Sequence, residues 1–159
     1  MVESIPFGWP KAENRTKELV AAGARIASEL GADYVKTFYT GDKESFRIVV
    51  ENSLVPVLIL GGPKIDSDLD ILKMVRDAID VGTSGIAMGR NIWGHNNIAG
   101  MTAALSSIIH DDFSVENAQK YLRKQHMKKF KIISKIPKFK KGNLNILEEE
   151  IINHVEQSL

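Results

Sequence analysis

A short apolar segment, a glycine-containing turn and an amphipathic helix follow one another three times in this chain, at intervals of about 25 residues. We predict the apolar segments to be strands, over about 32–39, 55–60 and 85–88. Apolar and polar residues do not alternate in them, which is typical of strands buried on both faces. Such strands belong to parallel sheets, because each parallel pair needs a crossover and the crossover helix covers the sheet. The sequence therefore predicts an α/β fold.

The segments between the strands have the periodicity of helices. Apolar residues at three- and four-residue spacing predict helices over about 13–30, 43–52, 67–81 and 97–109. Asp42 is a candidate N-cap, and Gly31 and Gly82 are candidate helix ends. Val2 to Ile5 predicts one more strand before the first helix. Two architectures fit this order, an open doubly wound sheet and part of a (β/α)8 barrel, and both place functional residues at the carboxyl ends of the strands.

Lys36 stands in the middle of the strand over 32–39. A lysine with buried neighbours on both sides loses hydration, which favours the uncharged amine, and a free amine is a nucleophile for carbonyl groups. The alternative is a lysine whose stem is buried and whose head reaches out to pair with a carboxylate. Lys36 is therefore the candidate catalytic nucleophile, and its surroundings decide between the two interpretations.

Glycines follow the next two predicted strands directly. Gly61 and Gly62 come after the strand over 55–60, and Gly89 and Arg90 come after the strand over 85–88. Glycine lets backbone N–H groups approach phosphate oxygens, a following helix N-terminus adds partial positive charge, and arginine supplies a forked donor. The sequence therefore predicts a phosphate site at these two strand ends.

Composition excludes several other classes. The 159 residues suit one ordinary domain, and 21 basic against 20 acidic side chains argue against nucleic acid or an anionic membrane as partner. With no cysteine and four scattered histidines, we expect neither a metal nor another cofactor. No apolar run approaches the roughly 20 residues of a membrane-spanning helix, and the first residues lack a signal-peptide pattern, so we expect a cytoplasmic protein.

Four segments together resemble the C-terminal half of the class I aldolases of the DeoC/LacD superfamily: GADYVKT, TGDKESFRIVV, PVLILGGPK and GIAMGRNIW. The resemblance covers about Val2 to Leu122. It is greatest to the archaeal-type fructose-bisphosphate aldolases, together with the 2-amino-3,7-dideoxy-heptulosonate synthases and the autoinducer-2 phosphate thiolases. The resemblance implies that the four predicted strands are strands 5 to 8 of a (β/α)8 barrel.

The resemblance also implies roles for the residues singled out above. Lys36, on strand 6, would form the Schiff base with the substrate. The glycines after strand 7, with Gly89 and Arg90 after strand 8, would bind the phosphate of a sugar phosphate. His95, in the loop after Arg90, is the histidine nearest this expected site, and we predict that it faces water rather than ligand.

This chain departs from the family pattern in two ways. A complete barrel needs about 250 residues, and strands 1 to 4 have no counterpart here. A second copy, a complementary half-barrel chain or the C-terminal segment can close such a half-barrel. In the fructose-bisphosphate aldolases a tyrosine on strand 5 moves the proton, and Ile5 stands at that position. Glu3 is a candidate replacement acid/base, with a surface glutamate as the alternative.

The segment 123–159 lies beyond the resemblance, and we predict a separate, mainly helical extension after a domain over 1–122. Ten lysines or arginines fall between Lys120 and Lys141, and an acidic, amphipathic stretch follows from Leu144. The extension either binds an anionic surface or covers the open side of the half-barrel or of a second subunit, and the near-zero total charge favours covering. Pro137 and Gly142 exclude one continuous helix through the basic segment.

These observations favour a Schiff-base aldolase that acts on a phosphorylated ketose such as fructose 1,6-bisphosphate. Two alternatives stay open. The first is a non-catalytic half-barrel that binds sugar phosphate or serves as an assembly partner. The second is thiolase-type acyl transfer with the same lysine.

Overall fold

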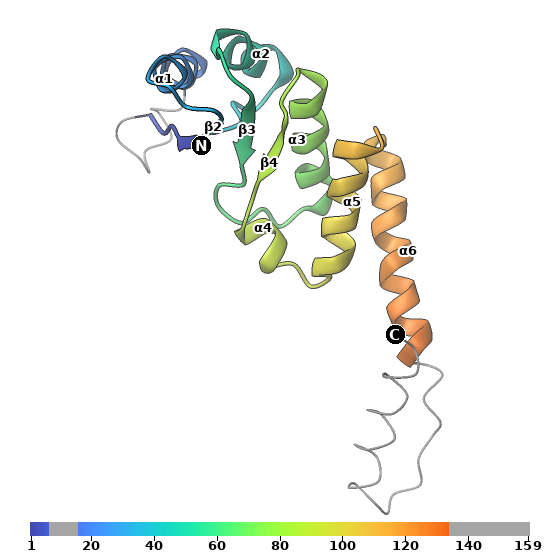
Figure 1. Ribbon diagram of the computed structural model, residues 1–159. Helices are drawn as coiled ribbons and strands as arrows, with labels where there is room; N and C mark the ends of the chain where they lie inside the picture. The colour runs from blue at the N-terminus through green and yellow to red at the C-terminus, as the bar shows by residue number, and fades with distance from the viewer. Residues whose placement is uncertain (7–15, 134–159) are drawn as a thin grey trace, which may run out of the picture. The chain divides into compact units, whose positions relative to one another are not determined.

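Four parallel strands form one sheet, and they lie side by side in the order in which they occur in the chain (Figure 1). They are β1 (Val2–Glu3), β2 (Val35–Thr37), β3 (Val57–Leu60) and β4 (Gly85–Ala87). The computed structural model describes residues 1–6 and 16–133, with side chains as far as residue 124. The predicted parallel α/β organisation is confirmed, although each strand is shorter than its apolar segment.

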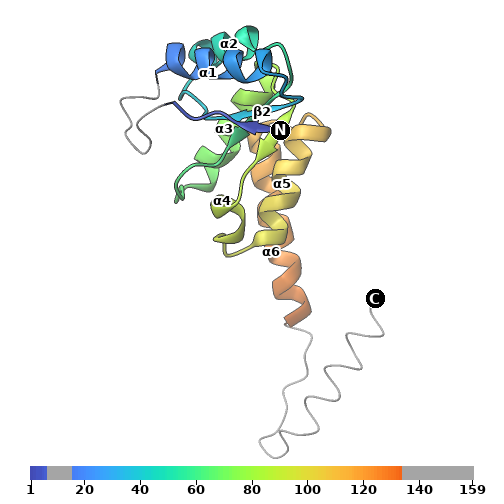
Figure 2. The same cartoon turned by 60° about the vertical axis from the view of Figure 1, so that its left-hand side comes forward.

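The strand order bears on the architecture. In a doubly wound sheet the order of the strands reverses at one point, and helices cover both faces. Here each βα unit adds its strand next to the preceding one, which is the arrangement in the wall of a barrel. Helices that follow one another along the chain also contact one another, α1 with α2, α2 with α3, and α3 with α5 (Figures 1 and 2).

Four helices begin at residues whose side chains cap them. They are α1 (Lys17–Glu29), α2 (Lys43–Asn52), α3 (Asp68–Asp80) and α5 (Ile98–His110). The capping side chain accepts a hydrogen bond from a backbone N–H three residues further on, and the caps are Thr16, Asp42, Ser67 and Asn97. The prediction of Asp42 as an N-cap is thus confirmed.

Two helices differ from the sequence prediction. The four-residue helix α4 (Arg90–Trp93) occupies a segment predicted to be a loop. Helix α6 (Val115–Ile133) runs through the boundary predicted at 122/123, and Pro137 and Gly142 lie outside the described residues. The chain separates into two compact units, 1–128 and 129–159. The acidic segment from Leu144 lies outside the described residues, so its predicted helix stays a prediction.

The hydrophobic core lies on one face of the sheet. Val35, Val57 and Ile59 project from that face and are almost completely buried. They form one cluster with the apolar faces of the helices, including Phe46, Ile71, Leu72, Met101, Leu105 and Ile108. Side chains alternate between the two faces of a strand, so Lys36 and its register neighbour Leu58 project from the opposite face, and both are half-buried. The helices therefore leave this second face available for a site.

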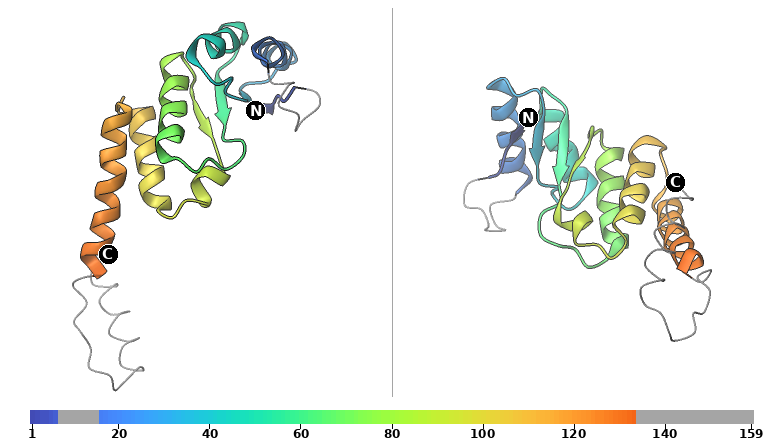
Figure 3. Two further views of the ribbon diagram at one scale, coloured as in Figure 1. Left: turned by 180° about the vertical axis from the view of Figure 1, so that it is seen from behind. Right: turned by 60° about the horizontal axis from the view of Figure 1, so that its bottom comes forward.

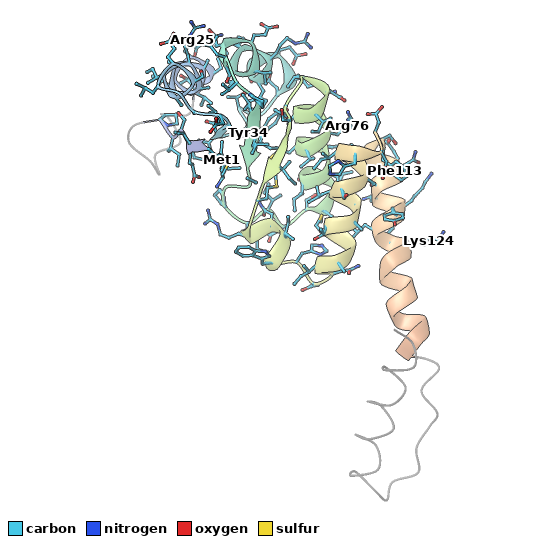
Figure 4. All side chains as sticks on the ribbon, in the orientation of Figure 1. Met1, Arg25, Tyr34, Arg76, Phe113 and Lys124 are labelled. Atoms are coloured by element: carbon cyan, nitrogen blue, oxygen red, sulfur yellow. The ribbon has the colours of Figure 1, made fainter. Side chains whose placement is uncertain are left out.

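Arg76 joins α3 to the segment after α5, and Figure 4 shows Arg76 and Phe113 close together at this corner. The guanidinium donates to Asp112 Oδ1 at 2.8 Å and to the Phe113 carbonyl oxygen at 3.3 Å. It also forms an ion pair with Asp80 at 2.6 Å. The views in Figure 3 agree that α3 and α5 lie side by side, as their contacts require. Within the described residues, no helix is both long and apolar enough to cross a membrane.

Candidate functional site

Lys36 projects from the helix-free face of the sheet. Its two neighbours in β2, Val35 and Thr37, are completely buried on the helix side. In register, Lys36 lies between Glu3 of β1 and Leu58 of β3, whose side chains share its face. The lysine side chain is 21% exposed, so most of it is removed from water.

Glu3 is the ionic partner of Lys36. Glu3 Oε1 lies 3.3 Å from Lys36 Nζ, and the glutamate side chain is 47% exposed. The sequence leaves two interpretations open, a desolvated amine and a lysine whose head pairs with a carboxylate, and the structure has the second geometry. The pair lies inside a pocket.

The short strand β1 is held beside β2 by contacts of Ser4. Thr37 Oγ1 donates a hydrogen bond to the Ser4 carbonyl oxygen at 2.8 Å, and the Ser4 N–H donates to the Lys36 carbonyl oxygen at 2.9 Å. Ser4 also packs against Gly23 of α1, where a Cβ atom would lie 2.6 Å from the serine hydroxyl. These contacts fix the backbone next to Glu3 and so hold its carboxylate near Lys36.

The predicted site residues come together around one pocket of about 340 Å³. Lys36 and Glu3 lie on its wall. The two glycine turns and Arg90 also line it. The remaining lining residues are Ile5, Phe38, Leu60, Ala87 and Trp93. The pocket thus places an amine, a carboxylate, an arginine and glycine backbone in one volume, as the sequence predicts for the carboxyl ends of parallel strands.

The turn after β3 depends on glycine but does not lead into a helix. Gly62 has φ of +61°, a left-handed conformation that side chains disfavour. Helix α3 begins only at Asp68, and its first turn is capped by Ser67. The helix predicted over 67–81 is therefore confirmed, but Pro63 to Ser67 separate its N-terminus from the glycine turn. Backbone N–H groups and Arg90 remain as the donors for an anion.

Arg90 is exposed and lines the pocket. Among the described residues its guanidinium makes no hydrogen bond and no ion pair, whereas Arg25 and Arg76 are both paired with carboxylates. A guanidinium that has no protein partner keeps all its donors for a ligand. Arg90 is therefore the strongest candidate for contact with a phosphate group.

His95 does not line the Lys36 pocket, which agrees with its predicted position away from the ligand. The side chain does not face water, however. Its side chain is 16% exposed, and its Nε2 lies 2.9 Å from Asp68 Oδ1. Its Nδ1 accepts a hydrogen bond from the Asn97 N–H at 2.9 Å. Both ring nitrogens thus join the start of α3 to the start of α5. This histidine also lines a separate, larger hollow of about 750 Å³ on that side of the chain.

Tyr39, just after β2, belongs to the core of the chain and not to the pocket. Its ring packs edge-on against Phe46, with ring centroids 5.1 Å apart, and its hydroxyl donates to Asp77 Oδ2 at 3.4 Å. Burial and the negative charge of Asp77 raise the pKa of Tyr39 above its ordinary value. A neutral phenol packed against Phe46 and bonded to a carboxylate serves the packing of the core.

Three pocket or turn residues escaped the sequence interpretation. Phe38 is 5% exposed and lines the pocket directly beyond β2. Trp93 is 75% exposed, and its ring lies against Gly89, where a Cβ atom would come within 3.4 Å. Asn91 is 2% exposed and bonds to the turn after β3. The signal available in the sequence was their position close to residues already singled out. Phe38 lies two residues after Lys36 in the predicted strand over 32–39, and Asn91 and Trp93 closely follow Arg90.

No group of three or more histidine, aspartate or glutamate side chains that could hold a metal ion occurs in the described part of the chain. The pocket contains one carboxylate, that of Glu3, and it is already paired with Lys36. The donors of the pocket are cationic or backbone N–H groups, which suit an anionic ligand.

Comparison with known proteins gives the same family along the same segments. The sequence profile of the DeoC/LacD family aldolases matches residues 8–95. The chain is 40% identical over 111 residues to the class 1 fructose-bisphosphate aldolase of Thermoproteus tenax, covering 69% of this chain and 42% of that protein. It is 44% identical over 94 residues to the 2-amino-3,7-dideoxy-D-threo-hept-6-ulosonate synthase of Halobacterium salinarum, covering 59% of this chain and 35% of that protein.

A solved structure of a Schiff-base-forming fructose-1,6-bisphosphate aldolase, studied through its reaction intermediates, has the same fold over the matched part. The TM-score is 0.65 and the identity 42%, over 69% of this chain and 44% of that chain. The chain thus spans less than half the length of the relatives that it matches.

Proposed function

Because this chain belongs to the DeoC/LacD family of aldolases, we propose that it is a class I aldolase for a phosphorylated ketose such as fructose 1,6-bisphosphate. The observation that carries the proposal is the single pocket that contains Lys36 and Glu3 together with Gly61, Gly62, Gly89 and Arg90. An amine near a cationic, glycine-lined rim suits a substrate with both a ketone and a phosphate.

Lys36 is the nucleophile in this proposal. Its neutral amine attacks the ketone carbon, the resulting carbinolamine loses water, and an iminium ion forms. A base then takes the proton of the hydroxyl group on the carbon two positions from the iminium carbon, the β-carbon. The bond between the α- and β-carbons breaks as this hydroxyl becomes a carbonyl, and its electron pair moves to the iminium nitrogen. An aldehyde leaves, and the enamine that remains takes up a proton and is hydrolysed to a ketone and the free lysine. No carbanion is exposed at any step.

Glu3 is the proposed acid/base. At 3.3 Å its carboxylate can accept the proton that the Lys36 ammonium must lose before attack. The same carboxyl group is placed to return a proton to the carbinolamine oxygen when water leaves. Ile5 lines the pocket at the position where the family has a tyrosine, but it has no proton to transfer.

The phosphate of the substrate is proposed to bind at the opposite rim. Arg90 supplies the charge, because it has no partner within the described chain, and the glycine turns supply backbone N–H groups. This anchor orients the ketone toward Lys36. Holding reactants in such a geometry supplies a large part of the rate gain of enzymes.

Closure of the barrel is part of the proposal. Within the described residues β1 and β4 are the edge strands of the sheet, and the apolar side chains of Val2 and Ile5 in and beside β1 are exposed. Exposed edge strands promote pairing with other chains. We expect a second copy or a complementary half-barrel chain to cover this side. Sedimentation of the purified chain tests it: a dimer supports the second copy, while a monomer at high concentration rules that partner out.

One observation favours the non-catalytic alternative, namely the ion pair that already occupies Lys36. A lysine that serves only to anchor β1 to β2 would bind Glu3 in the same way. In that case the pocket would still bind a sugar phosphate through Arg90 and the glycine turns, but Lys36 would form no covalent bond.

Borohydride trapping distinguishes these possibilities. The chain is mixed with dihydroxyacetone phosphate, reduced with borohydride, digested and analysed by mass spectrometry. If the proposal is correct, Lys36 gains the mass of the ketone less water plus two hydrogens, and Lys36→Arg is not labelled. Lysine labelling spread over the surface, or binding of the ketone without a covalent adduct, contradicts it. Adding a thiol acyl acceptor then shows whether cleavage yields an aldehyde or an acylated thiol.

A further inference from the structure

Asn91 follows Arg90 in α4, and its side chain is buried although it is polar. Only 2% of the residue is exposed. Its amide makes three hydrogen bonds, all to the backbone of the turn between β3 and α3. Oδ1 accepts from the Ile65 N–H at 2.7 Å, and Nδ2 donates to the carbonyl oxygens of Gly61 at 2.7 Å and Pro63 at 3.2 Å.

These bonds join the two turns that line the phosphate end of the pocket. The turn after β3 contains Gly61 and Gly62, and the turn after β4 contains Gly89 and Arg90. Among the described residues, no backbone–backbone hydrogen bond outside regular elements involves 61–66. The Asn91 amide therefore replaces the backbone pairing that ends where β3 and β4 end.

The two turns also approach each other too closely for a side chain. A Cβ atom on Gly61 would lie 3.0 Å from Asn91 Nδ2 and 3.2 Å from Met88 Cβ. Close packing against Asn91 and Met88 thus requires glycine at position 61, in addition to its proposed contact with the ligand. Asn91 itself does not line the Lys36 pocket, and it reaches the turn from the side of the larger hollow.

We propose that Asn91 is a positioning residue, which fixes the distance between the glycine turn after β3 and Arg90 and so builds the phosphate site without touching the ligand. The inference rests on the proposed function for its ligand, a phosphorylated ketone. The amide is required because one group must both accept and donate in the same plane. A carboxylate in its place keeps the bond from Ile65 N–H but sets negative oxygens against the Gly61 and Pro63 carbonyl oxygens.

The experiment compares phosphorylated and unphosphorylated ligands. Borohydride trapping at Lys36 is measured against the concentration of dihydroxyacetone phosphate and of dihydroxyacetone, and inorganic phosphate is titrated by calorimetry. The variants are Asn91→Asp and Gly61→Ala, which disturb the same contact from its two sides. Asn52→Asp is the matched control, since the Asn52 amide also donates to a backbone carbonyl but lies on the exposed side of α2.

If Asn91 positions the site, both variants raise the dihydroxyacetone phosphate concentration that gives half-maximal trapping about tenfold or more. They weaken the binding of inorganic phosphate by a similar factor, because well-aligned charge-assisted hydrogen bonds are lost. Trapping of dihydroxyacetone by Asn91→Asp stays within about twofold of the parent chain, and Asn52→Asp changes none of these values. Equal losses for both ketones, as general loss of structure would produce, overturn the inference, and so does no change.

Failure of the proposed function gives a different pattern. If the parent chain labels Lys36 with neither ketone, aldolase chemistry is excluded, and the phosphate titration alone decides about Asn91. Weaker phosphate binding in Asn91→Asp, with no change in Asn52→Asp, then still supports the positioning role. Unchanged binding, or no phosphate binding by the parent chain, contradicts it.

Discussion

Glu3 Oε1 lies 3.3 Å from Lys36 Nζ, across the first pair of parallel strands. The contact arises from register, because Glu3 and Lys36 are direct neighbours in the β1–β2 pairing and share one face of the sheet. Imine formation needs the lysine as a neutral amine. The same carboxylate is therefore either the base that prepares the nucleophile or the partner that keeps it inactive.

Glu3→Gln separates these two roles by the sign of its effect. As a base, Glu3 speeds proton transfer, so the amide lowers the rate of borohydride trapping at Lys36 by about 10²-fold or more at neutral pH. As a partner that only holds the ammonium, its loss makes the neutral amine easier to form and trapping faster. Initial rates over a series of pH values check the prediction. Glu18→Gln, on the exposed surface of α1, is the matched control.

Arg90→Ala is expected to weaken the binding of phosphorylated ligands but not that of unphosphorylated ones. Hydrogen bonds to charged groups are worth about 1.5–3 kcal/mol, which corresponds to a loss of roughly 10- to 150-fold in affinity. Arg90→Lys keeps the charge but loses the forked geometry, so it recovers only part of the binding. Calorimetric titration with dihydroxyacetone phosphate measures this, and exposed Arg47 on α2 gives the control Arg47→Ala. Equal binding by Arg90→Ala and the parent chain contradicts the assignment.

Tyr39→Phe is expected to change stability in alkaline solution. Burial and then the charge of Asp77 raise the pKa of Tyr39 in the folded chain. A raised pKa favours the neutral phenol, so its contribution is fully present below the ordinary value of about 10 and is lost as the pH rises through the folded-state value. The free energy of unfolding, measured with denaturant at pH values from neutral to strongly alkaline, should therefore fall less steeply with pH for Tyr39→Phe than for the parent chain. Parallel curves for the two proteins contradict the prediction.

Asp80→Asn is expected to reduce the loss of stability in acid. Burial alone would raise the pKa of Asp80, but hydrogen bonds from Lys43 and Arg76 outweigh it and hold the pKa below its ordinary value. A lowered pKa contributes stability above the unfolded-state value of about 4, and that contribution disappears as the pH falls through the folded-state value. Unfolding free energies measured across this range test it. Exposed Asp33, changed to asparagine, should leave the acid dependence of the parent chain intact.

Local features of this chain were predictable because their causes lie within a few residues. Asp42 caps α2 through the N–H of Ser45, three residues away, and the pattern of a polar cap before apolar spacing is visible in the sequence. The strands were also located correctly, although their lengths were not, because pairing ends where the neighbouring strand ends. The helix α4 was missed, since four residues carry too little periodicity to be seen.

The sequence by itself determined the order of strands and helices, the parallel sheet, the position of Lys36 within a strand and that of the glycines at strand ends. Those properties follow from periodicity and from where glycine interrupts it. Only the tertiary structure decided that Lys36 has Glu3 as its partner, that His95 bonds to Asp68, and that Asn91 joins the two turns. These contacts join segments far apart in the chain, so they depend on strand register and helix packing, which no local pattern specifies.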